Sequence, residues 1–360
     1  MKGFSSVYLD ILRLGAALVV LFHHAYDQWF PTHLSTSQQI NNGGHAAVVV
    51  FFVLSGFVIT HTTISNNRGG VQYIQARVSR LCSVVIPALV ITAIAQLVVI
   101  RFSSDLIDLY SRGNSLPRYI LASFFLNELW FFSAAPPING PLWSLSYEFW
   151  YYMIFGLAVY MNRSWRIILP LIACLIAGPK ILLMMPIWLT GCFVYILPKP
   201  SLKKSFSWCL VLLSLIVASL IVIYLRAIPY HVGSSPFYYS NQFFTDWITG
   251  FFIGLSLWLL PNERKNAADS NAVLRFRKIA DLTFPIYVLH FPLLIVYRTL
   301  CNYQLYNVQQ MWLGLTSVLL ACTLLGLLMD AQRVLWIRLF KYVLQPNTIL
   351  GIRLPSLTRP

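Results

Sequence analysis

YLDILRLGAALVVLFHH, residues Tyr8–His24, is an apolar stretch that carries four ionisable side chains, Asp10, Arg13, His23 and His24. An ionisable group at membrane depth costs several kcal/mol unless it is paired or faces a cavity, so each is a candidate for a functional site. An α-helix turns by about 100° per residue, which places Arg13 and His24 on one face, about 16 Å apart along the axis. Asp10 is within pairing reach of Arg13 on that face. His23 points about 80° away from it.

Two interpretations of this stretch stay open. In the first, Asp10 and Arg13 only anchor the helix at the membrane interface, and the two histidines close its far end. In the second, the polar stripe from Arg13 to His24 lines a reaction site.

The composition predicts an all-α polytopic membrane protein. The 360 residues are 58% hydrophobic and only 10% charged, with a mean hydropathy of +0.68, whereas soluble domains carry about 25% charged residues. The net charge of +15 is explained by basic loops between apolar spans, and no motif indicates a nucleic-acid partner. The cysteines show no CxxC spacing, so we expect neither a disulfide framework nor a metal site.

Ten apolar segments can be counted by the length of about 20 residues that a bilayer crossing needs; the fifth, residues 166–178, is short, and a helical hairpin formed by it and the sixth is the alternative. Most of the 26 Lys and Arg residues lie in segments that are inside if both termini are cytoplasmic, which predicts that orientation. The N-terminal apolar run shows no cleavage site and is expected to remain as the first span. The segments are residues 8–26, 45–64, 83–100, 142–161, 166–178, 181–198, 206–225, 243–260, 280–299 and 311–330.

Two of the outside loops carry apolar or aromatic side chains. Residues 119–133 are too short to span comfortably and are expected to form an interfacial or re-entrant segment. The tyrosines of residues 226–242 are interpreted either as an aromatic belt or as stacking surfaces for a sugar.

The fourth span begins PLWSLSYEFWYY at residues 141–152 and contains Glu148. This glutamate lies about 9 Å from the outer end, and His24 is expected at a similar depth from the same side. A His24–Glu148 pair is therefore geometrically allowed, and such a pair would raise the basicity of the imidazole for general-base catalysis. A purely structural hydrogen bond between two helices is the alternative.

At the inner face, Arg77 and Arg80 precede the third span and, with Arg13, could form a phosphate-binding cluster supplied from the cytoplasm. Ordinary positive-inside anchoring is the alternative. His290 and Ser55 are polar groups midway in their spans. A lone histidine there is more often a satisfied core residue, but several polar groups at membrane depth favour a shared cavity.

Five stretches resemble, in order and spacing, the membrane-bound acyltransferase-3 family of bacterial multi-pass enzymes. The arginine and histidine of that family's first motif correspond to Arg13 and His24, and its glutamate to Glu148. The family's late Ser-Tyr pair is Thr283-Phe284 here, so no role is assigned to it, and the acidic residue that often precedes the FF of the second span is absent. The stretches are LDILRLGAALVVLFHH at 9–24, VVVFFVLSGFVIT at 48–60, RVSRL at 77–81, PLWSLSYEFWYY at 141–152 and IYVLHFPL at 286–293.

The resemblance implies a bacterial inner-membrane O-acyltransferase that moves an acyl group, most often acetyl, from cytoplasmic acyl-CoA to a carbohydrate hydroxyl. The acceptor would be an extracytoplasmic or lipid-linked carbohydrate such as O-antigen or exopolysaccharide, and acyl-CoA is a substrate, so no bound cofactor is expected. Residues 1–335 would form the membrane acyltransferase domain and residues 336–360 a basic cytoplasmic tail, with no fused hydrolase-like domain. Membrane lipid is the other partner.

The expected site has three groups of residues. His24 and Glu148 are the catalytic candidates, with His24 acting either as a base or as an acylated intermediate, and Arg13, Arg77 and Arg80 bind the donor. The substrate-site candidates are Asp10, Ser55, Trp143, Ser146, Tyr147 and His290.

Two other functions compete with this interpretation. A proton-coupled transporter or flippase would use the same ionisable groups as a relay, although the sequence shows no internal repeat. A metal site formed by histidines is a weaker alternative, because no HExxH-type spacing supports it. The histidines concerned are His23, His24, His33 and His45.

Overall fold

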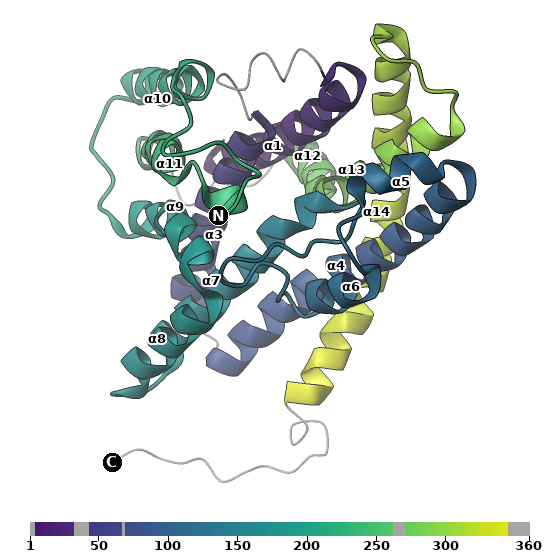
Figure 1. Ribbon diagram of the computed structural model, residues 1–360. Coiled ribbons are helices and arrows are strands. Elements are labelled where there is room, and N and C mark those ends of the chain that lie inside the picture. The colour runs from purple at the N-terminus through teal and green to yellow at the C-terminus, as the bar shows by residue number, and fades with distance from the viewer. Residues whose placement is uncertain (1–3, 32–42, 67–68, 262–270, 345–360) are drawn as a thin grey trace.

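The apolar stretches form long helices because a backbone inside a bilayer must satisfy its own N–H and C=O groups. The computed structural model describes residues 4–31, 43–66, 69–261 and 271–344, and this part of the chain contains helices and no strand (Figure 1). The all-α prediction is therefore confirmed. The helices are α1 (Phe4–Trp29), α3 (Gly43–Asn66), α4 (Gly70–Phe102), α5 (Ser104–Tyr110), α6 (Ser115–Ser123), η1 (Gly140–Leu142), α7 (Trp143–Tyr160), α8 (Trp165–Ala177), α9 (Pro179–Ile196), α10 (Lys204–Tyr224), η2 (Tyr238–Ser240), α11 (Phe243–Trp258), α12 (Asn271–Asp281), α13 (Thr283–Leu300) and α14 (Val308–Leu344).

The predicted apolar segments coincide largely with these helices, although the segment 280–299 begins in the last two residues of α12 and continues along α13. Seven helical stretches of the described chain are long and apolar enough to cross a membrane, and α8 and α11 are shorter apolar helices. A multi-pass membrane protein is thus supported, whereas the count of about ten spans and the side of each terminus stay predictions.

Helix α3 lies at the centre of the bundle, in contact with α1, α9 and α11. Gly56 of α3 and Gly191 of α9 allow their backbones to touch. A Cβ atom at Gly56 would lie 2.0 Å from the carbonyl oxygen of Trp188, and one at Gly191 would lie 2.0 Å from that of Val53. Small residues at such a crossing are the usual means of close helix packing in membranes. This close packing fixes the position of α3 and of the polar side chains it carries.

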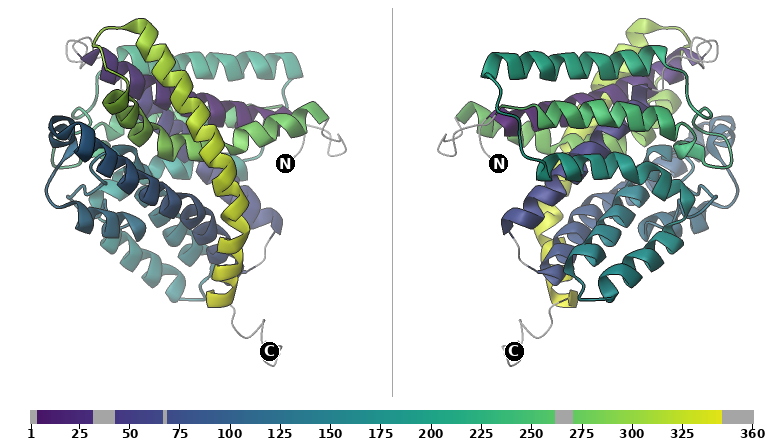
Figure 2. Two further views of the ribbon diagram at one scale, coloured as in Figure 1. Left: turned by 90° about the vertical axis from the view of Figure 1, so that its right-hand side faces the viewer. Right: turned by 90° about the vertical axis from the view of Figure 1, so that its left-hand side faces the viewer.

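Helix α4 begins at Gly70, well before the apolar run at residues 83–100, so its first turns carry Arg77 and Arg80. Helix α14 crosses α4 and α13 along one side of the molecule (Figure 2). It continues past residue 335 to Leu344, so the first part of the predicted tail is helical, while residues 345–360 lie outside the described chain.

The predicted interfacial segment at residues 119–133 contains the end of α6 and a series of turns. The carbonyl oxygen of Phe125 accepts hydrogen bonds from Ser146 (2.7 Å) and Trp150 (3.2 Å) of α7. Trp130 donates a backbone hydrogen bond to the carbonyl of Ala177, at the end of α8. The turns therefore pack against the helices that position the site.

Candidate active site

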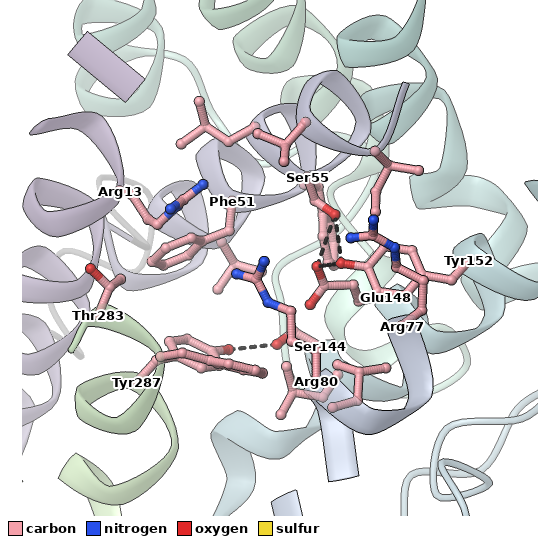
Figure 3. Close-up of a pocket in the computed structure, with 18 of the residues that line it drawn as sticks. Arg13, Phe51, Ser55, Arg77, Arg80, Ser144, Glu148, Tyr152, Thr283 and Tyr287 are labelled. Atoms are coloured by element: carbon pink, nitrogen blue, oxygen red, sulfur yellow. Dashed lines mark hydrogen bonds between the residues drawn. The ribbon is translucent and has the colours of Figure 1, made fainter. Parts of the chain in front are cut away.

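Five helical segments, α1, α3, α4, α7 and the α12–α13 region, enclose a cavity that we call the arginine cavity (Figure 3). It contains about 880 Å³ of empty space, part of it open to solvent. Its arginine and acidic side chains are Arg13, Arg77, Arg80, Glu148 and Asp281. The three arginines predicted to cluster thus lie around one cavity.

The arginines come from two helices and differ in their partners. Arg13 of α1 lies 3.7 Å from Asp10, which is the i,i+3 pair expected from the sequence, and Asp10 also lies 3.7 Å from Arg277 of α12. Arg77 of α4 donates to the hydroxyl of Thr62 at 3.0 Å. The Arg80 guanidinium forms no hydrogen bond or ion pair with any described residue and points into the cavity in Figure 3.

Glu148 is held by hydroxyl groups on the wall of the same cavity. Ser55 of α3 donates to its carboxylate at 2.8 Å, and Tyr152, one turn along α7, donates to the same oxygen. Ser55 in turn accepts a hydrogen bond from the indole of Trp188 at 3.1 Å. Ser55 therefore connects α3, α7 and α9 and holds the carboxylate toward the cavity (Figure 3).

The wall of the arginine cavity formed by α13 contains two further hydroxyl groups. The hydroxyl of Tyr287 donates to the carbonyl of Pro141 at 2.9 Å and lies 2.7 Å from the hydroxyl of Ser144. Thr283, to which the sequence analysis assigned no role, lines the cavity, and its buried hydroxyl has no hydrogen-bond partner among the described residues.

A second cavity, the histidine cavity, lies at the opposite end of the Arg13–His24 stripe and contains about 1090 Å³ of empty space. His24 of α1 and His45 of α3 line it, together with aromatic and basic side chains from other helices and the connecting segments. Val48 and Tyr287 line both cavities, so these two residues form a shared wall.

The two adjacent histidines of α1 point toward different helices, as helical phase predicted. The His24 ring lies 5.3 Å from that of His290 and 5.0 Å from that of Phe291, both on α13. His23 instead lies against α3, where a Cβ atom at Gly44 would be 2.7 Å from its ring. His24 is therefore the one on the cavity.

The His290 ring stacks against the His24 ring, but His290 lines neither cavity. Its Nδ1 atom donates to the carbonyl of Tyr287 at 2.7 Å, so this nitrogen carries the proton. Its Nε2 atom is buried without a hydrogen-bond partner in the described chain.

The structure contains a histidine–carboxylate pair, but its members differ from those expected. His45 Nε2 lies 2.8 Å from Asp246 Oδ2, and Gln242 donates to the other carboxylate oxygen at 2.9 Å. The expected pair of His24 and Glu148 is not formed, because the two side chains line different cavities and have the partners given above. Asp246 was not among the residues expected in a site, although it carries the same signal as Asp10, an acidic residue near the start of an apolar span.

Two of the substrate-site candidates, Ser146 and Tyr147, line neither of these two cavities. The Ser146 hydroxyl donates to the Phe125 carbonyl, and the Tyr147 hydroxyl lies 2.9 Å from that of Ser240. Both side chains are fully buried and hold α7 against its neighbours.

Trp143 does line the histidine cavity, but its ring is stacked against protein. The ring centroid of Tyr239 lies 4.4 Å away with planes 4° apart, and that of His45 lies 5.6 Å away with planes 13° apart. Tyr239 is the residue of loop 226–242 that reaches this cavity with Val232. These aromatic rings therefore shape the wall by stacking on one another.

Among the described residues there is no group of three or more His, Cys, Asp or Glu side chains placed to hold a metal ion. His33, one of the four histidines considered for a metal, lies outside the described chain.

Comparison with known proteins identifies one shared domain. Residues 6–331 match the family model Acyl_transf_3, described as an acyltransferase domain. An O-acetyl transferase of Shigella phage Sf6 is 24% identical over 206 residues, which cover 50% of this chain. The chain spans 56% of the length of that curated relative, and no solved structure matches.

Proposed function

Because the chain belongs to the acyltransferase-3 family and is therefore an acyltransferase, we propose that it moves an acyl group from cytoplasmic acyl-CoA to a carbohydrate hydroxyl. The acceptor is an extracytoplasmic or lipid-linked carbohydrate, and the acyl group is acetyl. The observation that carries the proposal is the shared wall of Val48 and Tyr287, which brings a cavity with three arginines against a cavity with two histidines.

The proposal includes a position in the membrane. The chain crosses a bacterial inner membrane about ten times, with both termini in the cytoplasm, as the excess of basic residues in the inside loops supports. In this orientation α1 runs outward, so the arginine cavity opens toward the cytoplasm and the histidine cavity toward the outside.

The arginine cavity binds the donor. Arg13, Arg77 and Arg80 offer planar guanidinium groups, which match phosphate oxygens with paired hydrogen bonds. The three arginines together with Glu148 and Asp281 give the cavity wall a formal net charge of +1. This positive charge suits an anionic ligand such as acyl-CoA. Glu148, held by Ser55 and Tyr152, is a positioning residue on this side of the reaction.

The histidine cavity binds the acceptor. A nitrogen of His24 removes the hydroxyl proton as the sugar oxygen attacks the thioester carbonyl carbon. A C–O ester bond forms, the C–S bond breaks, and the imidazolium returns the proton to the leaving thiolate. The alternative route, in which His24 first carries the acyl group, uses the same cavity and is distinguished by trapping an acyl-enzyme in the absence of acceptor.

The proposal is tested with membrane vesicles and acetyl-CoA labelled in the acetyl carbon. Vesicles with the cytoplasmic face outward should form base-labile labelled carbohydrate, whereas right-side-out vesicles should form none. A Val48→Trp variant should still bind acetyl-CoA and fail to transfer it, because the indole fills the shared wall. Full transfer by Val48→Trp, or transfer only from the opposite face, would overturn the proposed route.

A further inference from the structure

A third cavity is lined by the end of α3, the start of α4, the end of α7 and the C-terminal part of α14, which packs against α4. The hydrogen bond from Gln75 of α4 to the carbonyl of Ile337, at 3.3 Å, holds α14 against this end of α4. Arg77 lines both this cavity and the arginine cavity, so the two meet at its side chain. No residue that the sequence analysis selected, apart from Arg77, belongs to the third cavity.

The walls of the third cavity contain polar atoms without partners. Thr63 Oγ1 and Arg77 Nε are both buried and have no hydrogen-bond partner within the described chain. Buried polar groups are normally satisfied, and an exception requires an explanation such as a missing ligand. The Arg77 side chain already donates to Thr62, so its remaining Nε–H group is available to a ligand that joins the two cavities.

The other wall residues combine aromatic, amide and cationic groups. The rings of Tyr73 and Tyr160 lie 5.3 Å apart, with Gln72 on the same wall. Arg333 of α14 closes the cavity, and its only ion pair in the described chain is a 4.0 Å contact with Asp330, in which both side chains are at least half exposed. Such an exposed pair contributes little, so Arg333 can bind a second anion without a large loss.

We propose that this third cavity binds the nucleotide end of the acyl-CoA donor, with Arg77 at the diphosphate and Arg333 at the 3′-phosphate. This inference rests on the proposed function and adds a binding site to it. Arg77 and Arg80 lie one turn apart on α4, and Gln72 is about 12 Å from Arg80 along the helix axis. The donor therefore begins along α4, with its base among Tyr160 and Gln72, and its pantetheine arm runs past Arg80 toward the wall that the arginine cavity shares with the histidine cavity.

The first test compares acetyl-CoA with acetyl-3′-dephospho-CoA, which lacks only the 3′-phosphate. The protein in detergent should bind acetyl-CoA about tenfold more tightly, by titration calorimetry, and Arg333→Gln should lose this preference while keeping its affinity for the dephospho donor. Arg338→Gln, on the same helix but outside the cavity, should bind both donors as the unaltered protein does.

The second test places a large side chain in the third cavity by substituting Ala76, an exposed residue at its edge. Ala76→Trp should weaken the binding of both nucleotide donors, yet leave turnover of acetyl-pantetheine unchanged, since that donor has no nucleotide. If Arg333→Gln weakens both nucleotide donors equally or neither, or if Ala76→Trp slows acetyl-pantetheine, the third cavity is not the nucleotide site. If the unaltered protein binds none of the donors, the proposed function fails as well.

Discussion

Two groups of charged residues inside this protein differ in whether their charges are paired with other protein groups. Glu128 and Lys180 form an ion pair of 2.7 Å, and both side chains are fully buried. Lys180 also donates to the carbonyl of Phe132 at 2.6 Å and lies 5.1 Å from the ring centre of Tyr238. In the arginine cavity, by contrast, the Arg80 guanidinium has no ion pair or hydrogen bond with any described residue.

The difference separates a structural charge from a functional one. Burial raises the pKa of the Glu128 carboxyl, whereas the Lys180 ammonium and the Ser133 hydroxyl act in the opposite direction. Each of these groups already has its partner inside the protein, so the pair ties the turns after α6 to the start of α9. A cation such as Arg80, left without a protein partner and facing a cavity, is available to a ligand.

The largest expected effect is the loss of the folded protein when the structural pair is broken. Lys180→Met leaves Glu128 buried without a counter-charge, which should destabilise the fold by about 3–5 kcal/mol. The yield of monodisperse protein in detergent, followed by size-exclusion chromatography, should fall accordingly.

The control for this loss is the double variant Glu128→Gln/Lys180→Met. With both charges removed, most of the yield should return, because breaking one partner costs far more than replacing both. A double variant as poorly folded as Lys180→Met would show that the lysine acts through packing, and the contrast with the arginine cavity would lose its basis.

The next largest effect is expected on the rate of acyl transfer when the two histidines of α1 are substituted one at a time. His24→Ala should lower the rate of acyl transfer by about 100- to 10,000-fold, the usual contribution of a general base. His23→Ala should largely preserve it, since His23 faces α3. Transfer to the native glycan is measured at matched protein levels in cells that lack the chromosomal copy. An inactive His23→Ala with an active His24→Ala would move the catalytic role to His23.

Helix geometry explains why this part of the site was predictable. The periodicity of a single helix is rigid, so the sequence alone placed Arg13 and His24 on one stripe and turned His23 away from it. The same rule placed Arg77 and Arg80 together, once α4 is seen to begin at Gly70.

The His24–Glu148 pair was wrong for an equally physical reason. Counting residues from the end of a span gives depth in the membrane, but the rotation and neighbours of each helix are set by packing. Glu148 turns toward Ser55 of α3, whereas His24 turns toward His290 of α13. The pair of His45 and Asp246 joins residues 201 positions apart, which only the packing of α3 against α11 brings together.

A smaller effect is expected from a change within the arginine cavity that keeps the charge. Arg13→Lys should weaken acetyl-CoA binding about tenfold, since an ammonium group cannot replace the planar two-point contact of a guanidinium. Calorimetry on the purified protein measures this, with Arg166→Lys at the exposed start of α8 as the matched control. Unchanged affinity in Arg13→Lys and in Arg77→Ala/Arg80→Ala together would exclude these arginines from the donor site.

The smallest effect concerns the hydroxyl that holds the carboxylate of the cavity. Ser55→Ala removes the hydrogen bond to Glu148 and leaves the indole N–H of Trp188 without its acceptor, which should cost about 1–3 kcal/mol of stability. Ser83→Ala is the control, because that buried hydroxyl bonds only to the carbonyl of Arg80 on its own helix. Thermal unfolding should therefore shift down for Ser55→Ala alone. Acetyl-CoA affinity should stay within a few-fold, since the arginines are unaltered. If the alanine variant instead lost donor binding completely while staying folded, Glu148 and its hydroxyl partners would be part of the donor contact, and the distinction between positioning and binding residues in this cavity would have to be redrawn.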